Sequence, residues 1–299
     1  MNRFNAIAGA LAADSAAMGL HWLYDQDQIK TVSGSGDILF RQPESAIYKD
    51  KRGAFVHAAR RTGDLSHYGE SARIVGQLAA DGEYETALHR QRFFEAFGPC
   101  GHFSGYPDRP TKVLVARMIN EGDDITEPSG MDDNQMPALC VVPGLFAFDY
   151  SAQTIDTAAQ VISTNANVVA AAACVQQCLD HILQGRTLPE ALSLSANAMK
   201  GEVGPLVKEA LAIDQYNPLD TAKHFGLACY VEHSLPVVWH LLNHATDYES
   251  VVRDNIRCGG DSCGRSMALG AIAGLAFGVP DSLVRRMTGG RIPITISAT

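Results

Sequence analysis

Apolar residues recur at helical spacing along most of the chain. In the segment Tyr68–Asp81, for example, Ala72, Val75 and Leu78 fall on one helical face. No run alternates with period two over enough residues to predict a sheet, so the sequence predicts an all-α protein, a compact orthogonal multi-helix bundle. The pattern predicts helices at Phe4–Tyr24, Tyr68–Asp81, Arg90–Phe97, Lys112–Asn120, Ala138–Phe148, Thr154–Ser163, Ala166–Gln184, Leu188–Met199, Gly204–Ile213, Tyr230–Leu242, Thr246–Ile256 and Asp281–Thr288.

The segment Cys258–Gly278 is the organising element of this pattern. It reads CGGDSCGRSMALGAIAGLAFG and carries no charge after Arg265. Gly259 and Gly260 suit a tight entry to a helix, and Asp261 then falls in the first turn, where unpaired backbone N–H groups favour its charge. The rest is apolar around most of the helix, which predicts a buried central helix whose small residues let neighbouring helices approach closely.

The predicted breaks fall at glycines and prolines, and a long polar, Gly-rich stretch from Asp25 to Gly63 is predicted to be a loop. Neither an interdomain linker nor a repeat of fixed period is present, so we expect residues 1–299 to form one domain. The breaks are expected at Gly144, Gly185, Pro205, Pro218, Pro236, Gly259 and Pro280.

Composition narrows the classes of partner. The 299 residues include 24 basic and 33 acidic ones, a formal net charge of −9, and no long basic run, which argues against nucleic acid and against an anionic membrane surface. Seven scattered cysteines do not form a disulfide framework, and no His or Cys set has structural-zinc spacing. The apolar N-terminal run loosely resembles a signal peptide, but Asp14 interrupts it, so we expect a retained helix and a cytoplasmic protein.

Four polar clusters interrupt this apolar helical chain. They are Asp14, GDLSHYGE from Gly63 to Glu70, MDDNQ from Met131 to Gln135, and GGDSCGR from Gly259 to Arg265. The last three lie at predicted helix N-termini or in loops just before them. Helix N-termini directed at one place would form a pocket that favours anions and carboxylate-held metals.

The order and spacing of these clusters resemble the ADP-ribosylglycohydrolase family, and especially its crystallin J1-like branch. AGALAADSAAMGLHW resembles the family's opening helix with Asp14 at its acid, and the block that ends in CGGDSCGRSMALGAIAGLAFGVP resembles its C-terminal G-G-D-T-D-T segment. NVVAAAACVQQCLDHILQGRTLPEAL also follows a family pattern. The resemblance implies an all-α fold in which two Mg²⁺ or Mn²⁺ ions hold the ribose of ADP-ribose while its glycosidic link is cleaved.

The residues that hold those metals in the family are largely replaced in this chain. The late motif keeps Asp261 at its first acid and Ser262 at its Thr, but it has Cys263 at the second acid and Gly264 at the last Thr. Mg²⁺ requires hard oxygen ligands, and thiol and tyrosine do not substitute for carboxylates. The family's early T-D-D-T aligns with His67, Tyr68, Gly69 and Glu70.

We therefore expect no cofactor and no binuclear site of the family kind; Mg²⁺ would bind only if the loop carboxylates Asp132 and Asp133 replaced the missing ligands. Arg265 would repel a dication, and its guanidinium would fit the space of a lost metal and pair with a carboxylate or phosphate.

Structural roles are an alternative for each of these residues. Glu70 and Asp261 also suit helix N-termini, Asp132 and Asp133 suit a solvated loop, and Asp14 suits a hydrogen bond to a neighbouring helix end. No helical spacing links His21, His57, His67 and His102, which favours packing or surface positions over metal ligation. Cys263 beside a helix N-terminus is expected to have a lowered pKa.

Two functions fit the sequence, and whether the protein is an enzyme stays open. The first is hydrolysis of an N- or O-glycosidic bond in an ADP-ribose-like or nucleoside-like small molecule. The second is a ligand-binding or structural protein of the J1-crystallin kind, without turnover. For the first, the candidate catalytic residues are Asp261, Asp133 and Glu70, and the candidate substrate-binding residues are Asp14, Tyr68, Asp132, Gln135 and Arg265.

Overall fold

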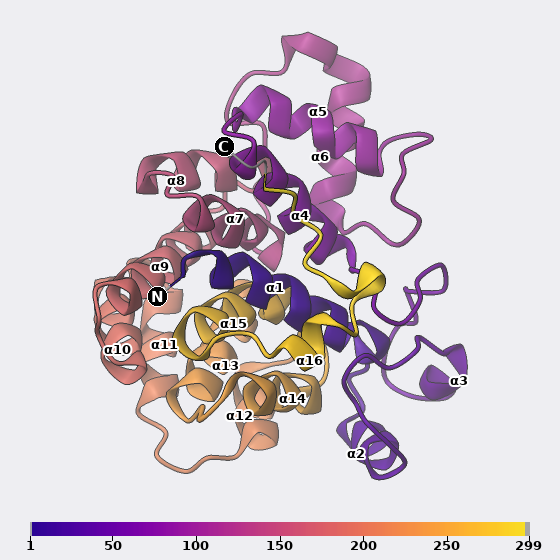
Figure 1. The fold of residues 1–299 in the computed structure, drawn as a ribbon, viewed down its shortest axis with the longest axis vertical. Coiled ribbons are helices and arrows are strands. Elements are labelled where there is room, and N and C mark those ends of the chain that lie inside the picture. The colour runs from indigo at the N-terminus through magenta and orange to yellow at the C-terminus, as the bar shows by residue number, and fades with distance from the viewer. Residues whose placement is uncertain (1, 297–299) are drawn as a thin grey trace.

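The computed structural model describes residues 2–296, which form an all-α bundle (Figure 1). Within this range the chain folds into sixteen α-helices and four short 3-10 helices, with three isolated β-bridges. The α-helices are α1 (Phe4–Ala17), α2 (Gln26–Gly34), α3 (Ser45–Tyr48), α4 (His67–Ala80), α5 (Thr86–Phe97), α6 (Arg109–Glu121), α7 (Val141–Ala147), α8 (Ala152–Ile162), α9 (Ala166–Leu183), α10 (Leu188–Ala198), α11 (Val203–Leu211), α12 (Pro218–Phe225), α13 (Val231–Asn243), α14 (Tyr248–Cys258), α15 (Ser262–Phe277) and α16 (Asp281–Val284).

Helices α1 and α15 pack against each other at the centre of the bundle. Both consist largely of Ala and Gly, and nearly all their residues are buried. At the crossing, a Cβ added to Gly9 would lie 2.1 Å from the carbonyl oxygen of Gly270, and one added to Gly274 would lie 2.3 Å from that of Asn5. Glycine is therefore required at these positions for the backbones to approach so closely.

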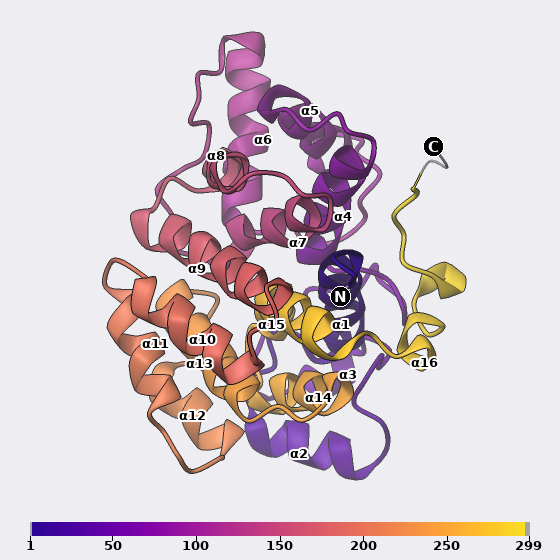
Figure 2. The same cartoon turned by 60° about the vertical axis from the view of Figure 1, so that its left-hand side comes forward.

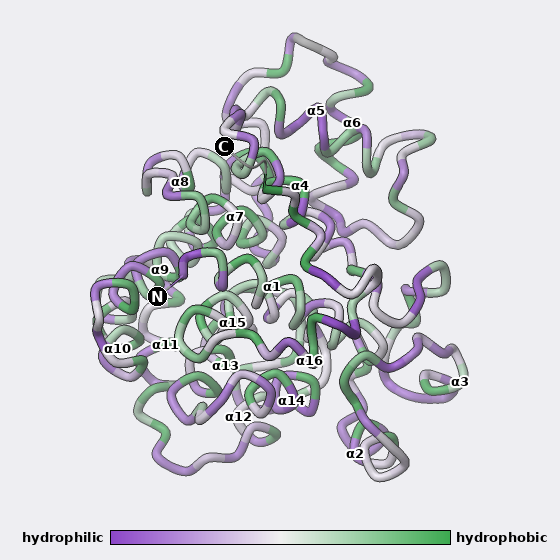
Figure 3. Tube along the Cα trace, in the orientation of Figure 1, coloured by the Kyte–Doolittle hydropathy of each residue, from purple (hydrophilic) through white to green (hydrophobic). Residues whose placement is uncertain are grey.

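The remaining helices enclose this central pair. Helix α1 also packs against α4, α7 and α14, and α15 against α9, α13 and α14. Figure 2 shows α4, α5 and α6 on one side of the pair and α10 to α13 on the other. The central helices are mainly apolar along the chain trace, whereas the segments around α2 and α12 are mainly hydrophilic (Figure 3).

The sequence pattern located most helices to within a few residues. The prediction of an all-α bundle is confirmed, and the predicted helix Tyr68–Asp81 corresponds to α4. The first helix ends at Ala17 and continues as a 3-10 turn, Met18–Leu20, rather than reaching Tyr24. The last predicted helix, Asp281–Thr288, is a single turn that ends at Val284.

Several predictions about loops and breaks were wrong, including the break at Gly144, which lies inside α7. The stretch Asp25–Gly63 contains α2, which Asp25 caps by accepting a hydrogen bond from the Gln28 N–H, and the short α3. Pro218 begins α12 instead of ending a helix, because the N–H that proline lacks has no intrahelical partner in a first turn. Pro236 is the sixth of the 13 residues of α13, so the helix lacks one internal hydrogen bond at this point and nevertheless continues.

Candidate functional site

Asp14 projects from α1 to the N-terminus of α4. Its carboxylate accepts hydrogen bonds from the Ser66 N–H (2.8 Å) and the Ser66 hydroxyl (2.5 Å), and the same hydroxyl oxygen caps α4 by accepting the Tyr68 N–H (3.1 Å). The side chain is fully buried, and this burial raises the pKa of Asp14 to about 6. Asp14 thus joins the central helix pair to the segment that carries His67 and Tyr68.

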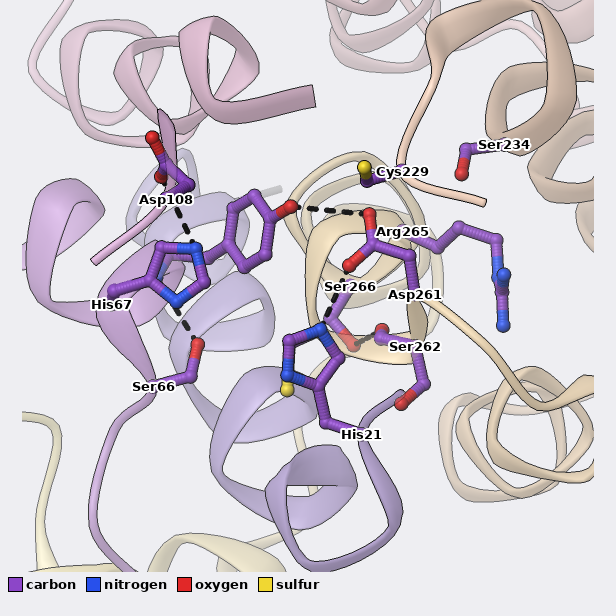
Figure 4. Close-up of polar contacts among 12 residues, drawn as sticks. His21, Ser66, His67, Asp108, Cys229, Ser234, Asp261, Ser262, Arg265 and Ser266 are labelled. Atoms are coloured by element: carbon purple, nitrogen blue, oxygen red, sulfur yellow. Dashed lines mark hydrogen bonds and ion pairs between the residues drawn. The ribbon is translucent and has the colours of Figure 1, made fainter. Parts of the chain in front are cut away.

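Asp261 immediately precedes the central helix α15, makes no capping hydrogen bond with its side chain, and is also fully buried (Figure 4). One oxygen, Oδ1, lies 2.8 Å from His21 Nε2, and the other, Oδ2, accepts a hydrogen bond from the Tyr68 hydroxyl at 3.2 Å. Burial is the largest single influence and opposes the charge, but the hydrogen bond from His21 together with the charges of His21, Arg265 and His67 holds the pKa of Asp261 below its usual value. Both carboxylate oxygens are therefore occupied by protein donors.

The His21 imidazole connects Asp261 to a second buried histidine. Burial lowers the pKa of His21, which favours the neutral ring, so Nε2 carries the proton given to Asp261 and Nδ1 is left as an acceptor. Nδ1 lies 2.7 Å from His57 Nε2, whose ring stacks on that of His21. His57, only 1% exposed, also has its pKa lowered by burial.

His67 lies beside this pair at the first residue of α4. Its ring centroid is 6.2 Å from that of His21, and its Nε2 lies 3.1 Å from Asp108 Oδ2. Asp108 also caps α6 by accepting the Thr111 N–H. Sequence analysis expected these histidines to be packing or surface residues, whereas the structure gathers His21, His57 and His67 near buried carboxylates. Figure 4 shows His21 beside Asp261 and His67 beside Asp108.

Cys263 lies in the first turn of α15, and its Sγ contacts the Asp14 carbonyl oxygen at 3.6 Å. We expected the helix N-terminus to lower its thiol pKa, but the structure reverses this. Burial, and then the charges of Asp14 and Asp261, raise the pKa of Cys263 well above its usual value. A thiol surrounded by carboxylates is poorly suited to act as a free nucleophile.

Glu70 lies outside this buried cluster. Its carboxylate is held by Arg73, at 2.7 and 3.0 Å, and by His102 Nε2 at 3.0 Å. It borders a cavity of about 180 Å³ with Arg60, Met287 and Thr288, away from the neighbours of Asp261. The structure therefore does not bring Glu70 together with Asp261, and its predicted supporting role in catalysis has no geometric basis here.

Arg265 is fully buried, and its side chain points away from His21 and His67 (Figure 4). Its Nε donates to the Asn255 side-chain oxygen at 2.7 Å, and its Nη2 donates to the backbone carbonyls of Asn255 and Gly259. The guanidinium thus fastens the end of α14 to α15. The expected contact of Arg265 with a base or phosphate is not available in this arrangement.

An open, polar pocket of about 490 Å³ lies where the MDDNQ segment faces α9 and α11. Asp132 is exposed and accepts a hydrogen bond from the Asn165 side chain. Asp133 is 6% exposed, holds Gln135 through its backbone and side-chain N–H groups, and lies 3.6 Å from Arg109 Nη1. The pocket is lined by Arg109, Asp132, Asp133, Asn134, Asn165, Asn167, Glu202, Val203, Leu206 and Glu232.

Cys229 lies between this pocket and the buried cluster. Its Sγ contacts the Gln135 side-chain oxygen at 3.2 Å, and Figure 4 shows it beside Asp261. Burial raises the pKa of Cys229, and the carboxylates of Asp261, Asp133 and Asp108 raise it further. Tyr68 and Asp261 are in contact, and Cys229 connects Gln135 to the same region, so the predicted polar clusters at Gly63–Glu70, Met131–Gln135 and Gly259–Arg265 lie close together.

The buried cluster does not offer the ligands that a pair of magnesium ions requires. Near Asp261, the nearest groups are the imidazole of His21, the phenol of Tyr68 and the thiol of Cys263. None of these is a hard anionic oxygen donor, and both oxygens of Asp261 are already engaged. The donor set present therefore does not fit binuclear Mg²⁺.

Sequence analysis missed Ser66, Asp108, His21 and His57 as site residues. For Ser66 and Asp108 a signal existed, because each immediately precedes a helix start and has a side chain typical of an N-cap. No such signal existed for His21 and His57. His21 contacts Asp261, which is 240 residues away along the chain. His57 follows His21 by 36 residues and lies in the predicted loop, where no periodicity fixes its neighbours.

Three comparisons with known proteins concern the family of this chain, a similar sequence and a similar fold. The sequence model of the ADP-ribosylglycohydrolase family matches residues 2–293. Crystallin J1A of Tripedalia cystophora is 23% identical over 305 residues, which cover 95% of this chain and 91% of that protein. A solved structure described as an ADP-ribosylglycohydrolase-related protein complex has a similar fold, with a TM-score of 0.61 and 14% identity over 99% of this chain and 98% of that one.

Proposed function

The chain belongs to the ADP-ribosylglycohydrolase family, and we propose that it binds an ADP-ribose-like or nucleoside-like molecule and hydrolyses its N- or O-glycosidic bond without the family's metal pair. The binding site in this proposal is the pocket beside Asp132 and Asp133. Cys229 links this region to the buried cluster, because its thiol contacts Gln135 of the MDDNQ segment and lies beside Asp261.

The observation that carries the proposal is the lining of this pocket. It combines carboxylates with the side-chain amides of Asn134, Asn165 and Asn167, groups that donate to and accept from the hydroxyls of a ribose. The Arg109 guanidinium is largely exposed at the pocket and offers a positive charge to a phosphate. Such a lining suits a polyhydroxylated, anionic small molecule better than an apolar one.

Asp132 and Asp133 supply the two carboxylates that glycoside cleavage without a metal requires. They are adjacent in sequence but differ in surroundings, because Asp132 is exposed and Asp133 is nearly buried. Contrasting surroundings are how enzymes divide acid and base roles between two carboxylates. We assign the acid/base role to Asp133. Asp261, the other acid/base candidate from the sequence, is enclosed by His21 and Tyr68 and has a positioning role in this proposal.

Ligand binding without turnover is the second candidate. It is favoured by the contacts of the Asp261 carboxylate, because both of its oxygens are hydrogen-bonded within the protein. The similarity to a protein named as a crystallin points in the same direction.

Hydrolysis assays separate the two candidates. Purified protein is incubated with an ADP-ribosyl N-glycoside and with a nucleoside, and release of free ADP-ribose or base is followed by chromatography. We expect turnover that falls by about 100-fold or more in Asp133→Asn, because general acid–base groups contribute about that much. Glu44→Gln, at an exposed residue remote from the pocket lining, is the control for loss of one charge and should keep full activity.

The circular dichroism of Asp133→Asn must match that of the wild type, so that loss of activity is not loss of fold. Binding of the same ligands with no detectable turnover in wild type would favour the second candidate. Turnover that survives in Asp133→Asn would contradict the assignment of the acid/base role.

A further inference from the structure

We propose that His21, His57 and Cys263 form a binding site for a zinc-class divalent cation at the centre of the molecule. One ligand atom from each of the three lies within 4.8 Å of the other two, and all three side chains are buried. They come from three separate parts of the chain: the turn after α1, the loop before α4, and the first turn of α15. A cation here would tie these three segments together.

The spacing of the three ligand atoms suits tetrahedral coordination. Zn–N distances of about 2.0–2.1 Å and a Zn–S distance of about 2.3 Å place neighbouring ligand atoms roughly 3.3–3.8 Å apart. In the structure the three ligand atoms all lie within 4.8 Å of one another, so shifts of about an ångström or less bring them to these separations. His21 Nδ1 and His57 Nε2, now 2.7 Å apart and hydrogen-bonded, would separate by roughly half an ångström when the cation took the place of the proton between them. That proton would pass from His57 Nε2 to His57 Nδ1, which has no hydrogen-bond partner among the residues that the structure describes.

A second and independent observation is the partner of the other His21 nitrogen. His21 Nε2 hydrogen-bonds Asp261, so Nδ1 is the nitrogen that faces His57. Metal-bound histidines characteristically donate their other ring N–H to a carboxylate, which fixes the ring and its tautomer. Asp261 is in turn oriented by the Tyr68 hydroxyl. The supporting contacts of a metal-binding histidine are therefore already in place.

The donor set selects the class of cation. A thiolate and two imidazoles suit Zn²⁺ or Co²⁺ and are poor ligands for Mg²⁺. Binding releases the Cys263 proton to solvent, and the resulting thiolate, with the nearby carboxylates of Asp14 and Asp261, offsets the charge of the cation. The substitution of Cys263 for the family's second acid thus replaces a hard ligand by a soft one, at a site distinct from the pocket beside Asp133.

Cobalt titration tests this site directly. The full-length protein is reduced, freed of metal with a chelator, and titrated with Co²⁺ while its absorption is recorded. We expect a single equivalent to produce a thiolate-to-cobalt charge-transfer band and the visible bands of a tetrahedral ion, and Zn²⁺ but not Mg²⁺ to abolish them. A protein that stays folded and gives no such bands would overturn the proposal.

Matched variants locate the ligands. Cys263→Ser and His57→Gln should each remove the charge-transfer band or weaken Co²⁺ binding by at least about 10-fold, a scale set by effects at metal sites. Cys178→Ser, which removes a buried thiol in α9, should leave the titration unchanged. Bands that persist in Cys263→Ser would overturn the proposal.

X-ray absorption at the cobalt edge covers the case in which a variant fails to fold, because it uses the wild type. Sulfur and imidazole in the first shell support the site, and a shell without sulfur overturns it. Neither measurement uses a sugar ligand, so failure here leaves the proposed glycoside pocket untouched.

Discussion

At the residue scale, the site depends on how a buried carboxylate keeps its charge. Asp261 has no exposed surface, and burial opposes its charge, yet its pKa is lowered because the hydrogen bond from His21 and the positive charges around it act together. Charged acceptors form hydrogen bonds roughly twice as strong as neutral ones, which is how such a carboxylate stays ionised in the interior.

A buried histidine remote from the site gives a residue-scale prediction about pH. Burial, and to a smaller extent the charge of Arg90, lowers the pKa of His89 from 6.5 to about 3. A depressed histidine pKa means that the folded state holds fewer protons than the unfolded state. The contribution of His89 to stability is therefore complete above about pH 6.5 and is lost as the pH falls toward 3.

We expect the free energy of unfolding of the wild type to fall by several kcal/mol, on the order of 1.4 kcal/mol per pH unit from this group, between pH 6.5 and 4. His89→Asn keeps an acceptor for the Tyr84 hydroxyl, now 3.1 Å from Nδ1, and removes the titration, so its slope should be shallower. Urea unfolding at three pH values measures both slopes. Equal slopes would show that His89 is not held neutral.

At the scale of elements, the crossing of α1 and α15 sets the position of everything else in the site. Asp14 leaves one helix and Asp261 begins the other, so the distance between the helix axes fixes where the two acids lie. That distance depends on glycines whose backbones touch. Tyr248 of α14 adds a hydrogen bond from its hydroxyl to the Gly9 carbonyl, at 2.6 Å.

Gly9→Ala should therefore destabilise the protein by about 1–3 kcal/mol or more, because the new methyl group meets a carbonyl oxygen that cannot move freely. The matched control is Gly34→Ala at the end of α2, where an added Cβ meets nothing within 4 Å. It should be neutral or stabilising by about 0.5–1 kcal/mol. Thermal and urea unfolding compare the two, and equal effects would contradict the account of the crossing.

Sequence periodicity predicted the long helices because each buries one continuous apolar face, as α4 and α9 do. It missed α2 because only Ile29 and Val32 of that helix are buried, too few to set a period. Pro218 was misread because the first turn of a helix does not need the N–H that proline lacks. Pro236 was misread because α13 continues through it although one internal hydrogen bond is lost. Capping residues such as Asn217, which bonds the Asp220 N–H, would have corrected the first of these.

At the scale of the whole molecule, membership of the family and the clustering of acids could be predicted from the sequence. The motifs keep their order and spacing along the chain even where single residues are replaced. The hydrogen-bond partners of each side chain could not be predicted in this way. Whether Arg265 faces a ligand or the Asn255 side chain depends on how α14 meets α15, and whether Glu70 joins Asp261 depends on the side of α4 that it occupies.

Among residues 2–296, no helix is long and apolar enough to cross a membrane.

The distribution of thiols gives a prediction for the whole fold. Cys100 is exposed and Cys229 is half-buried, whereas Cys140, Cys174, Cys178, Cys258 and Cys263 are buried. Alkylation of the native protein at mildly alkaline pH, read by mass spectrometry, should modify Cys100 first and Cys229 slowly. All seven should react after denaturation. Rapid native alkylation of Cys263 would show that the centre is open to solvent, contrary to the packing described.

The central claim is that this chain binds an ADP-ribose-like ligand without the magnesium pair of its family. The most direct test is calorimetric titration of the purified protein with ADP-ribose, with and without millimolar Mg²⁺. We predict binding with the same affinity in both conditions, because the donors around Asp261 do not fit Mg²⁺ and the pocket beside Asp133 presents its own polar groups. Binding that appears only with Mg²⁺ would contradict the claim and assign the ion to Asp132 and Asp133, and no binding in either condition would contradict the proposed class of ligand.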